Sequence, residues 1–400
     1  MRDNLRRGAI VAGTGPVGLV TALALAREGV PVTLVGERSE SSSGRTVALF
    51  DDSIRLLAEL GVWQEIAKSA APLRALRIVD DTDNLFRWRP LTFAAAEIGL
   101  DAFGCNIELS ALNAALRLVA QNVPGIHIIE GLAAAPFFDA DRAGCSVAGQ
   151  RLDAELIVAA DGQRSPLREA AGITARLERL PQWAMTGIFR HQLPHENVST
   201  EFHTREGPCT LVPLASLDES RGHQGTSSLV WMVRSVKAKA LGALDDEAFS
   251  LAVERRTHSI LGKMQLAGPR GAVPLAIAHL GSIRATRLAL VGEAAHAFPP
   301  IGAQGLNLGL RDVAMLAALA GEALSEDRDI GAADVLDAYQ DARANDIATR
   351  SAAVNLMNRS LLSTLLPFDL ARGLGMAALD LVGPLRRFVM REGVAPRFGR

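Results

Sequence analysis

The sequence predicts an α/β fold with two interleaved domains and a helical C-terminus. An apolar strand, a glycine-rich turn and an apolar helix occupy residues 9–28, and a strand followed by a glycine-rich helix start recurs at 288–309. Between them, at about 185–233, short β-like segments alternate with turn residues. A chain of 400 residues also exceeds what one hydrophobic core usually serves. A β-rich domain is therefore expected to be inserted into the domain that the two outer segments build.

The first unit is a strand at 9–12, the turn Gly13-Thr14-Gly15-Pro16-Val17-Gly18, a helix that Gly29 ends, and a second strand at 32–35. In this context GxGxxG is the Rossmann fingerprint of dinucleotide binding. Its glycines allow a tight turn, the approach of a pyrophosphate and close helix–strand packing. Glu37 lies 19 residues past the last glycine, where a carboxylate can accept a hydrogen bond from an adenosine ribose.

The main alternative for this segment is an export signal. Residues 1–7 are basic, residues 8–26 carry no charge, and Ala24-Leu25-Ala26 is similar to a signal-peptidase site. Three glycines and a proline make a poor apolar core, however, and cleavage would destroy a complete nucleotide-binding unit. A cytoplasmic protein is therefore expected.

The composition is that of a globular enzyme. Hydrophobic residues make up 48% of the chain and charged residues 22%, which excludes wholesale disorder. The net charge of −2 gives no reason to expect a nucleic-acid partner. Cys105, Cys145 and Cys209 are isolated, so neither a disulfide framework nor a metal site is expected.

The middle of the chain is expected to pass between the two domains. Asp161-Gly162 ends a buried strand at the carboxyl edge, where open α/β sheets place ligands; a plain turn is the alternative. The expected elements are a helix at 53–59, a β-hairpin at 73–93, a helix at 108–121, a strand at 126–129, a ribbon at 145–152, a strand at 155–159, a helix at 245–259, a β-segment near 273, a strand at 288–291 and mostly helix at 334–400.

The segment after the last strand has the character of a ligand loop. Gly292-Glu293 ends the strand, and a proline-bearing loop leads to a helix expected from about Ala303. Three glycines within 302–309 leave room for a flat, bulky group, while Gln304 and Asn307 offer hydrogen bonds. A helix start with few side chains suits an electron-rich or anionic group, because its N–H groups point outward. Together with the first unit, this loop predicts a flavin site.

These motifs resemble the flavoprotein aromatic hydroxylases related to p-hydroxybenzoate hydroxylase. The likeness narrows to the ubiquinone-biosynthesis hydroxylases (the UbiH, UbiF and VisC group) through Gly44–Leu49, the SxxLLxxLGVW run ending at Trp63, and Pro300–Asp312. It extends from residue 8 to about residue 390. The resemblance implies FAD, with NADPH or NADH as transient reductant, and hydroxylation of the ring of a prenylated phenol by O2 through a flavin C4a-hydroperoxide.

The resemblance also implies a role for each motif. The first turn and the Asp-Gly turn would hold the FAD pyrophosphate, and the residues after the second strand the adenosine end. Arg45 would contact the ribityl–pyrophosphate region, Glu293 the ribityl hydroxyls and the loop at 300–307 the isoalloxazine ring. Glu108 lies in a helix start that the family places by the flavin. The implied cofactor-binding residues are Gly13, Gly15, Pro16, Val17, Gly18, Glu37, Arg38, Arg45, Asp161, Gly162, Gly292, Glu293, Pro300, Gly302, Ala303, Gln304, Gly305, Leu306 and Asn307.

Four departures from the family pattern bear on these roles. Gly292-Glu293 stands where the family has Gly-Asp, and Gly302-Ala303 reverses an Ala-Gly pair, which predicts a strained alanine or a rebuilt turn. Gly36 separates Glu37 from the second strand. Tyr339, the only tyrosine of the chain, lies in a helical segment after the flavin motifs, so a tyrosine is not expected to activate the phenol.

No catalytic residue is named from the sequence, because the implied chemistry needs position and dryness more than side chains. A histidine base would raise the electron density of the ring. His191, His203 and His279 lie in or beside the expected substrate domain, and each is expected to be structural or exposed because no partner is identifiable. His296 is interpreted as part of the cofactor loop.

The C-terminal region is basic and apolar. Residues 359–400 hold seven arginines and three acidic residues, a net charge of +4, with apolar groups at 361–370 and 384–391. Such helices can lie on an anionic membrane surface; a packing helix or subunit contact is the alternative. No uncharged run there reaches the roughly 18 residues of a membrane span. Peripheral contact with the inner membrane, or with a quinone-biosynthesis complex, is therefore one expectation.

Two other classes remain compatible with the sequence. One is another flavin oxidoreductase, such as a prenyl reductase; a halogenase is disfavoured because its WxWxI signature is absent. The other is a flavin-binding accessory protein of a quinone-biosynthesis complex, which the Gly-Glu and Gly-Ala departures motivate. The expected FAD-binding domain comprises 1–72, 99–180 and 284–333, the substrate domain 73–98 and 181–283, and the C-terminal helical region 334–400.

Overall fold

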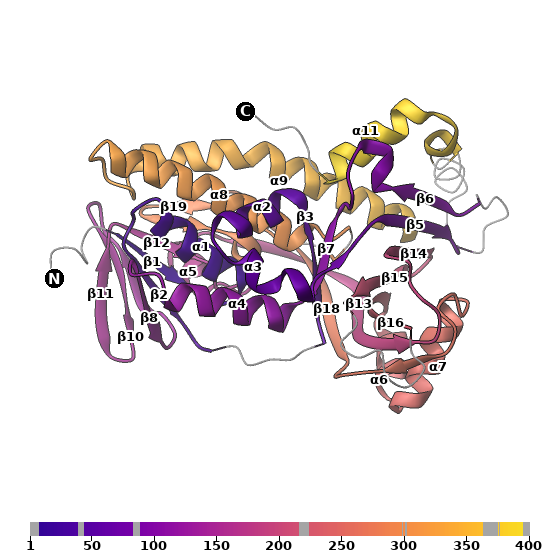
Figure 1. Cartoon of the computed structure of the whole chain (residues 1–400). Helices are drawn as coiled ribbons and strands as arrows, with labels where there is room; N and C mark the ends of the chain where they lie inside the picture. The colour runs from indigo at the N-terminus through magenta and orange to yellow at the C-terminus, as the bar shows by residue number, and fades with distance from the viewer. Residues whose placement is uncertain are drawn as a thin grey trace.

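A computed structural model describes residues 8–38, 44–82, 89–215, 224–297, 299–300, 302–362, 375 and 377–394. Two sheet-based domains lie next to each other, and the long helices α8 (Gln304–Ser325) and α9 (Ala333–Leu362) run along the first (Figure 1). Parts of several sequence predictions lie outside the described residues. They are the basic segment 1–7, residues 83–88 of the hairpin, residue 301 of the loop before α8, and residues 363–374, 376 and 395–400 of the C-terminal region.

The first domain is built on a six-stranded sheet with the order β19-β20-β12-β1-β2-β8. All neighbouring strands are parallel except β19, which pairs antiparallel with β20. Every residue of β1, β2, β12 and β20 is buried, because both faces of the sheet are covered. The strands are β1 (Ala9–Ala12), β2 (Val32–Gly36), β8 (Ile126–Glu130), β12 (Leu156–Ala159), β19 (Arg284–Ala285) and β20 (Leu288–Leu290).

Helices and a small ribbon cover this sheet. Helix α1 packs against α4 and α8, and α9 packs along α8. The ribbon of β9, β10 and β11 contacts β1 and β12. Because β20, β12 and β1 are neighbours and parallel, their carboxyl ends lie side by side at one edge. The covering elements are α1 (Pro16–Arg27), α4 (Leu109–Gln121), β9 (Ala134–Phe138), β10 (Ala143–Val147) and β11 (Gln150–Ala154).

The second domain is an eight-stranded sheet with the order β17-β13-β16-β15-β14-β5-β6, in which β18 also pairs with β13. The early hairpin of β5 and β6 joins the later strands through a parallel pair of β5 with β14. The expected α/β fold with an inserted mixed sheet is confirmed. The strands are β5 (Ala75–Asp80), β6 (Leu91–Ala94), β13 (Ala175–His191), β14 (Val198–Thr204), β15 (Gly207–Leu214), β16 (Gly225–Arg234), β17 (Met264–Leu266) and β18 (Gly271–Leu280).

The two faces of this large sheet have different neighbours. On the outer face, Leu229 and Trp231 of β16 pack under α6 and α7. On the opposite, inner face, Ser228 Oγ lies 2.7 Å from Thr46 Oγ1 and 3.2 Å from Asn106 Nδ2, which belong to a small sheet of β3, β7 and β4. The inner face is therefore turned toward the first domain. The elements are α6 (Ser235–Gly242), α7 (Asp246–Arg256), β3 (Thr46–Phe50), β4 (Ala71–Pro72) and β7 (Gly104–Glu108).

Shorter elements complete the chain. Helix α11 lies above β6 at one end of the molecule (Figure 1), where Met390 packs against Leu91 and Phe93. No helix within the described ranges is both long and apolar enough to cross a membrane. The remaining elements are α2 (Asp51–Glu59), α3 (Trp63–Ile66), η1 (Ala67–Ser69), η2 (Ala95–Ile98), α5 (Pro166–Ala170), η3 (Gly292–Ala294) and α11 (Gly383–Val394).

The structure differs from the sequence analysis mainly inside the β-rich parts. Instead of short segments from about residue 185, β13 is one strand of 17 residues that starts at Ala175. Its pairing with β18 shifts register between Arg179 and Trp183, around Pro181, and this irregularity concealed the continuity of the strand. Strand β9 and helix α6 were also missed.

Candidate cofactor site

Three turns meet at the carboxyl edge of the parallel sheet, after β1, β12 and β20. A Cβ added to Gly13 would lie 2.2 Å from the carbonyl oxygen of Ala160, and a Cβ on Gly18 would lie 1.9 Å from that of Gly13. Gly13 also has a φ of 122°. Only glycine therefore allows the first turn to close on itself and against the second.

Val17 joins the first turn to the third. A Cβ on Gly292 would lie 3.0 Å from Val17 Cγ2, and a Cβ on Gly309 would lie 3.1 Å from the same atom. Helices α1 and α8 pack against each other at this point. The two glycine-rich segments, almost three hundred positions apart, thus form one cluster of turns.

This cluster leaves room where the pyrophosphate and flavin ring are expected. A Cβ built on Gly15 or on Gly305 would meet no atom within 4 Å. Neither α1 nor α8 has a side-chain cap, so their first N–H groups are available to an anionic or electron-rich group. Pro16 at the start of α1 has no N–H to satisfy. The residues present fit an FAD.

Asp161 adds an unused hydrogen-bonding atom to the site. Its Oδ2 accepts from the N–H of Leu167 at 3.3 Å, whereas its Oδ1 is buried and has no partner among the described residues. Burial raises the pKa of this carboxyl. A buried oxygen without a partner costs free energy unless a ligand satisfies it, so Asp161 suits a cofactor contact.

Arg168 holds the second turn against the third. Its side chain is buried, with Nη1 donating to the carbonyl of Ala294 at 3.0 Å and Nη2 donating to that of Gln163 at 3.0 Å. In the sequence, Arg168 accompanies the Asp-Gly turn, six residues after Gly162. That spacing carries no signal of the distant carbonyl of Ala294 that the side chain reaches.

The end of β2 shows why a glycine, Gly36, precedes the acidic Glu37. A Cβ on Gly36 would lie 2.8 Å from Thr14 Cγ2, and the Thr14 hydroxyl donates to the carbonyl oxygen of Glu37. Gly36 therefore makes room for the first turn. Glu37, Arg38 and Arg45 are exposed, and their contacts with the adenosine and ribityl parts remain predictions.

The loop before α8 contains the strained alanine that the reversed pair predicts. Gly302 and Ala303 both have positive φ, 64° and 54°. The side chain of Gln304 is already used, because Nε2 donates to the carbonyl of Gly302 at 3.1 Å and Oε1 accepts from Arg350. The exposed residues of this region are Glu293, Pro300, Gly302 and Gly305, while Leu306 is half-buried.

The side chain of Asn307 is engaged by the protein, so any contact of this residue with FAD, which stays a prediction, would use its backbone. Its Nδ2 donates to the carbonyls of Ala48 at 2.8 Å and Ala303 at 2.7 Å. Its Oδ1 accepts from the N–H of Phe50 at 2.9 Å and from the Ser53 hydroxyl at 2.7 Å. These four bonds use the full capacity of the amide. Asn307 therefore fixes β3 and α2 to the start of α8.

A buried network of charges, which the sequence analysis missed, supports this loop from behind. Asp312 Oδ2 accepts from the N–H of Gly292 at 3.0 Å and lies 2.6 Å from His296 Nε2. Its Oδ1 accepts from Arg343 Nε at 2.8 Å, and Arg343 Nη1 donates to Asp346 at 2.8 Å. Because its oxygens reach Gly292 and His296, Asp312 fixes the loop before α8. This agrees with the interpretation of His296 as part of the cofactor loop.

Two of the three histidines considered as bases, and the single tyrosine, have partners within the protein. His191 is buried, with its ring nitrogens 2.7 Å from the carbonyl of Leu193 and 2.9 Å from the Ser227 hydroxyl. His279 is exposed beside Glu178 at 3.3 Å. Tyr339 is fully buried and donates to the carbonyl of Leu290 at 2.7 Å, and burial raises its pKa well above the usual value. Tyr339 is therefore not available to a substrate.

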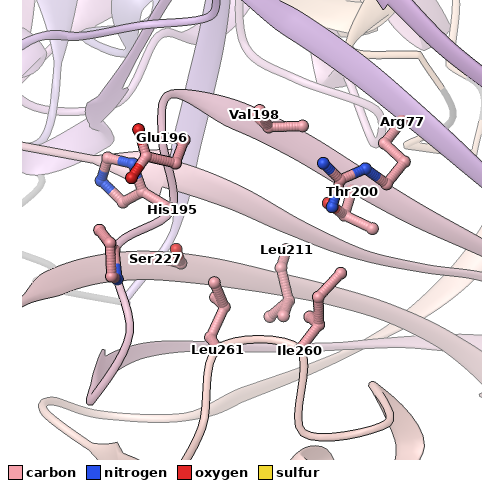
Figure 2. Close-up of a pocket in the computed structure, with 10 residues that line it drawn as sticks. Arg77, His195, Glu196, Val198, Thr200, Leu211, Ser227, Ile260 and Leu261 are labelled. Atoms are coloured by element: carbon pink, nitrogen blue, oxygen red, sulfur yellow. The ribbon is translucent and has the colours of Figure 1, made fainter.

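A small cavity of about 70 Å³ lies on the outer face of the large sheet, away from the cofactor cluster. Figure 2 shows Arg77 near Thr200 on one side and His195 near Glu196 on the other, above the apolar Leu211. Burial lowers the pKa of His195. The cavity is too small for a prenylated phenol and lies on the wrong face, so we assign it no part in the reaction. No group of three or more metal-ligating side chains occurs among the described residues.

This arrangement defines a flavoprotein of the α/β class, with a Rossmann-like FAD-binding domain and a second sheet turned toward that domain. The chain matches the FAD binding domain family over residues 7–123 and 135–352 and belongs to it. It is 33% identical over 393 residues to ubiquinone hydroxylase UbiL of Rhodospirillum rubrum, covering 96% of this chain and 89% of that one. The chain is therefore a member of the FAD-dependent aromatic hydroxylases, within the group of the ubiquinone hydroxylases.

A further sequence relative agrees with this placement, and two solved structures share the fold. The 3-demethoxyubiquinol 3-hydroxylase of Escherichia coli is 28% identical over 395 residues, which cover 95% of this chain and 96% of that protein. The crystal structure of p-nitrophenol 4-monooxygenase PnpA from Pseudomonas putida superposes with a TM-score of 0.79 at 19% identity, covering 98% and 99% of the two chains. The HpxO structure from Klebsiella pneumoniae, complexed with FAD and uric acid, gives a TM-score of 0.75 at 16% identity, covering 97% of each chain.

Proposed function

We propose that this monooxygenase hydroxylates the aromatic ring of a prenylated phenol, a precursor of ubiquinone, with NADPH or NADH as reductant. The convergence of three turns around an uncapped helix start carries the FAD part of this proposal. The substrate class is supported by the relatives, whose names describe ubiquinone hydroxylases, and by the apolar cluster of Leu91, Phe93 and Phe103 beside Phe50.

In this proposal the chain binds and positions the cofactor. Gly13, Gly15 and Gly18 admit the pyrophosphate, and Asp161 offers its unused oxygen. Pro300 and residues 302–306 line the isoalloxazine ring, and Asn307 holds the start of α8 to β3. When bound, FAD supplies the oxygen-activating chemistry, while the two domains orient the phenol and keep water from it.

Deletion of the gene, followed by mass spectrometry of the quinone intermediates, tests the proposal. We expect a prenylated precursor that lacks one hydroxyl group to accumulate. A strain with an unchanged quinone profile would remove the pathway assignment. Purified protein that is colourless and takes up no added FAD would contradict the cofactor assignment as well.

We further propose that α11 and the residues just before it dock on an anionic phospholipid surface, where a prenylated substrate resides. Leu381, Val382, Leu385, Phe388 and Val389 are 73%, 46%, 40%, 62% and 42% exposed. Elsewhere in the described chain, large exposed apolar side chains are scattered. Such a patch, flanked by arginines, suits lipid headgroups and acyl chains.

The rest of α11 is anchored to the second domain. Arg386 donates to both oxygens of Glu97, at 2.6 and 2.7 Å, while Arg387 and Arg391 are exposed. Removing one exposed arginine is expected to cost about 1 kcal/mol of membrane affinity, or roughly fivefold. The cations therefore complement an anionic surface beside the apolar patch.

Sedimentation with phosphatidylglycerol-containing vesicles tests this surface. We expect the wild type to bind, R387Q to bind several-fold more weakly, and a double variant L385Q/F388Q to bind little. V236Q is the matched control, because Val236 is 80% exposed on α6, away from the patch. Absence of wild-type binding contradicts the proposal. A dimer that the double variant disrupts would assign the patch to a second copy of the chain instead.

A further inference from the structure

A buried acid–histidine pair lies on β14, close to the middle of the large sheet. His203 Nε2 and Glu201 Oε1 are 2.7 Å apart, and the two residues are 7% and 8% exposed. The Thr210 hydroxyl lies 3.4 Å from the second carboxylate oxygen, Glu201 Oε2. Burying two ionisable groups is expensive compared with burying apolar side chains, so packing alone does not account for the pair.

The strand register places this pair on the inner face. Glu201 is directly opposite Thr210, and Thr210 is directly opposite Val230. Val230 is two residues from Ser228 on the same strand, and residues two apart share a face. Since Ser228 contacts Thr46 of the first domain, Glu201 and His203 are turned toward the FAD-binding domain. The cavity of Figure 2 lies on the opposite face.

The pair also adjoins the apolar cluster next to the cofactor loop. Glu201 is the register partner of Ile78, which packs in the cluster that contains Phe50. The N–H of Phe50 donates to Asn307 at the start of α8. From the strand and residue spacings, Glu201 lies roughly 12 Å and His203 roughly 16 Å from Ser228 along the same face of the sheet.

The chemistry of the pair specifies which atom can take up a proton. A carboxylate only accepts hydrogen bonds, so Nε2 of neutral His203 carries the hydrogen that Glu201 accepts. This leaves the lone pair on Nδ1, the arrangement of a histidine base oriented by an acid. Asp80 is the register partner of His203, and its carboxylate accepts from the Thr82 hydroxyl at 2.5 Å.

We propose that His203 is a catalytic base for the phenolic proton and that Glu201 is its positioning residue. The inference rests on the proposed function. The O–H bond of the bound phenol breaks and an Nδ1–H bond forms, so the ring becomes a phenolate and His203 an imidazolium that Glu201 stabilises. The proton returns to the phenolic oxygen when the product leaves. The phenolate is the more electron-rich ring and the better target for hydroxylation.

The variants H203Q and E201Q test the proposal, with product and NAD(P)H consumption measured for a farnesylated phenol between pH 6 and 10. We expect H203Q to lower product formation at neutral pH by about 10²- to 10⁴-fold. Its rate should recover as the pH approaches the pKa of a free phenol, about 10, because the substrate then ionises without a base. E201Q should show a smaller loss with the same pH trend.

Two controls separate a base from a structural residue. H279Q and E178Q alter the exposed pair on β13 and β18 and should leave the rate and pH profile unchanged. The methyl ether of the same phenol has no proton to remove, so wild type and H203Q should treat it alike. Far-ultraviolet circular dichroism and the FAD spectrum report whether each variant is folded. If H203Q does not retain FAD, the rate and pH profile of the isosteric E201Q are compared with those of the wild type instead.

A second measurement does not depend on turnover. The ultraviolet difference spectrum of the bound farnesylated phenol reports whether it is ionised. We expect phenolate in the wild type and neutral phenol in H203Q near pH 8. Equal ionisation in both, or a wild-type pH profile in the variants, overturns the role of His203. Wild-type protein that ionises the phenol without hydroxylating it would instead contradict the proposed function and leave the pair's role standing.

Discussion

Replacing Asn307 with leucine tests whether its amide holds the fold together or contacts the cofactor. The change keeps the number and branching of the side-chain heavy atoms but removes four hydrogen bonds at a site that is 2% exposed. At about 1 kcal/mol each, the lost bonds cost about 4 kcal/mol. Burial of the added apolar surface returns about 1–2 kcal/mol. We therefore expect N307L to lower the free energy of unfolding by about 2–3 kcal/mol.

Thermal unfolding of the FAD-free protein, followed by circular dichroism, measures this effect. For a domain of this size the loss corresponds to a melting temperature lower by about 5–10 °C. N122L is the matched control, since Asn122 is exposed and donates only to the carbonyl of Leu118, at 2.8 Å. If N307L melted like the wild type but bound FAD tenfold more weakly, the amide would serve the cofactor and the reasoning would be refuted.

Four other substitutions probe the site. G18A should abolish FAD binding or folding, because its Cβ would lie 1.9 Å from the carbonyl oxygen of Gly13. G15A should fold normally and bind FAD more weakly, as a titration of flavin fluorescence would show. Equal behaviour of the two variants would contradict the geometry. A303V should lower the free energy of unfolding in a urea titration by about 1–2 kcal/mol, because a β-branched residue tolerates a positive φ poorly; a variant as stable as wild type would argue against that φ. D161N should stabilise the FAD-free protein at neutral pH. Burial raises the pKa of Asp161, so in the wild type the protonated carboxyl stabilises the folded state below the unfolded-state pKa, and this stability is lost as pH rises through the folded-state pKa. Asparagine has no such carboxyl to ionise. A melting-temperature difference that did not grow from pH 4 to 7 would exclude this account.

The elements that bind the cofactor could be read from the sequence because local chemistry specifies them. The strand, turn and helix at 9–27 need glycines at fixed positions, and the structure shows the contacts that demand them at Gly13 and Gly18. The same holds for the left-handed conformation of Ala303, which the reversed order of Gly302 and Ala303 predicted. The motifs themselves lie within a few residues along the chain, although the contact that demands Gly13 is with the distant Ala160.

The parts that sequence could not supply depend on partners far along the chain. Asp312 meets Arg343 across two helices, and no spacing rule links them. His203 was considered as a base, but its partner Glu201 became visible only when a buried strand put both on one face. The sequence also carried no sign that the Asn307 side chain is buried and bonded to β3 and α2, because an exposed helix start and a buried one look alike in sequence.

The parallel sheet has a consequence for how the protein is made. Strand β1 ends at Ala12, whereas β20, which completes the same edge, starts at Leu288. A ribosome adding 5–20 residues per second needs on the order of tens of seconds to cover that interval. Throughout this time the newly made first strand has no complete binding edge, so the nascent chain acquires FAD only late in translation. A shortage of FAD would therefore affect chains that are close to completion.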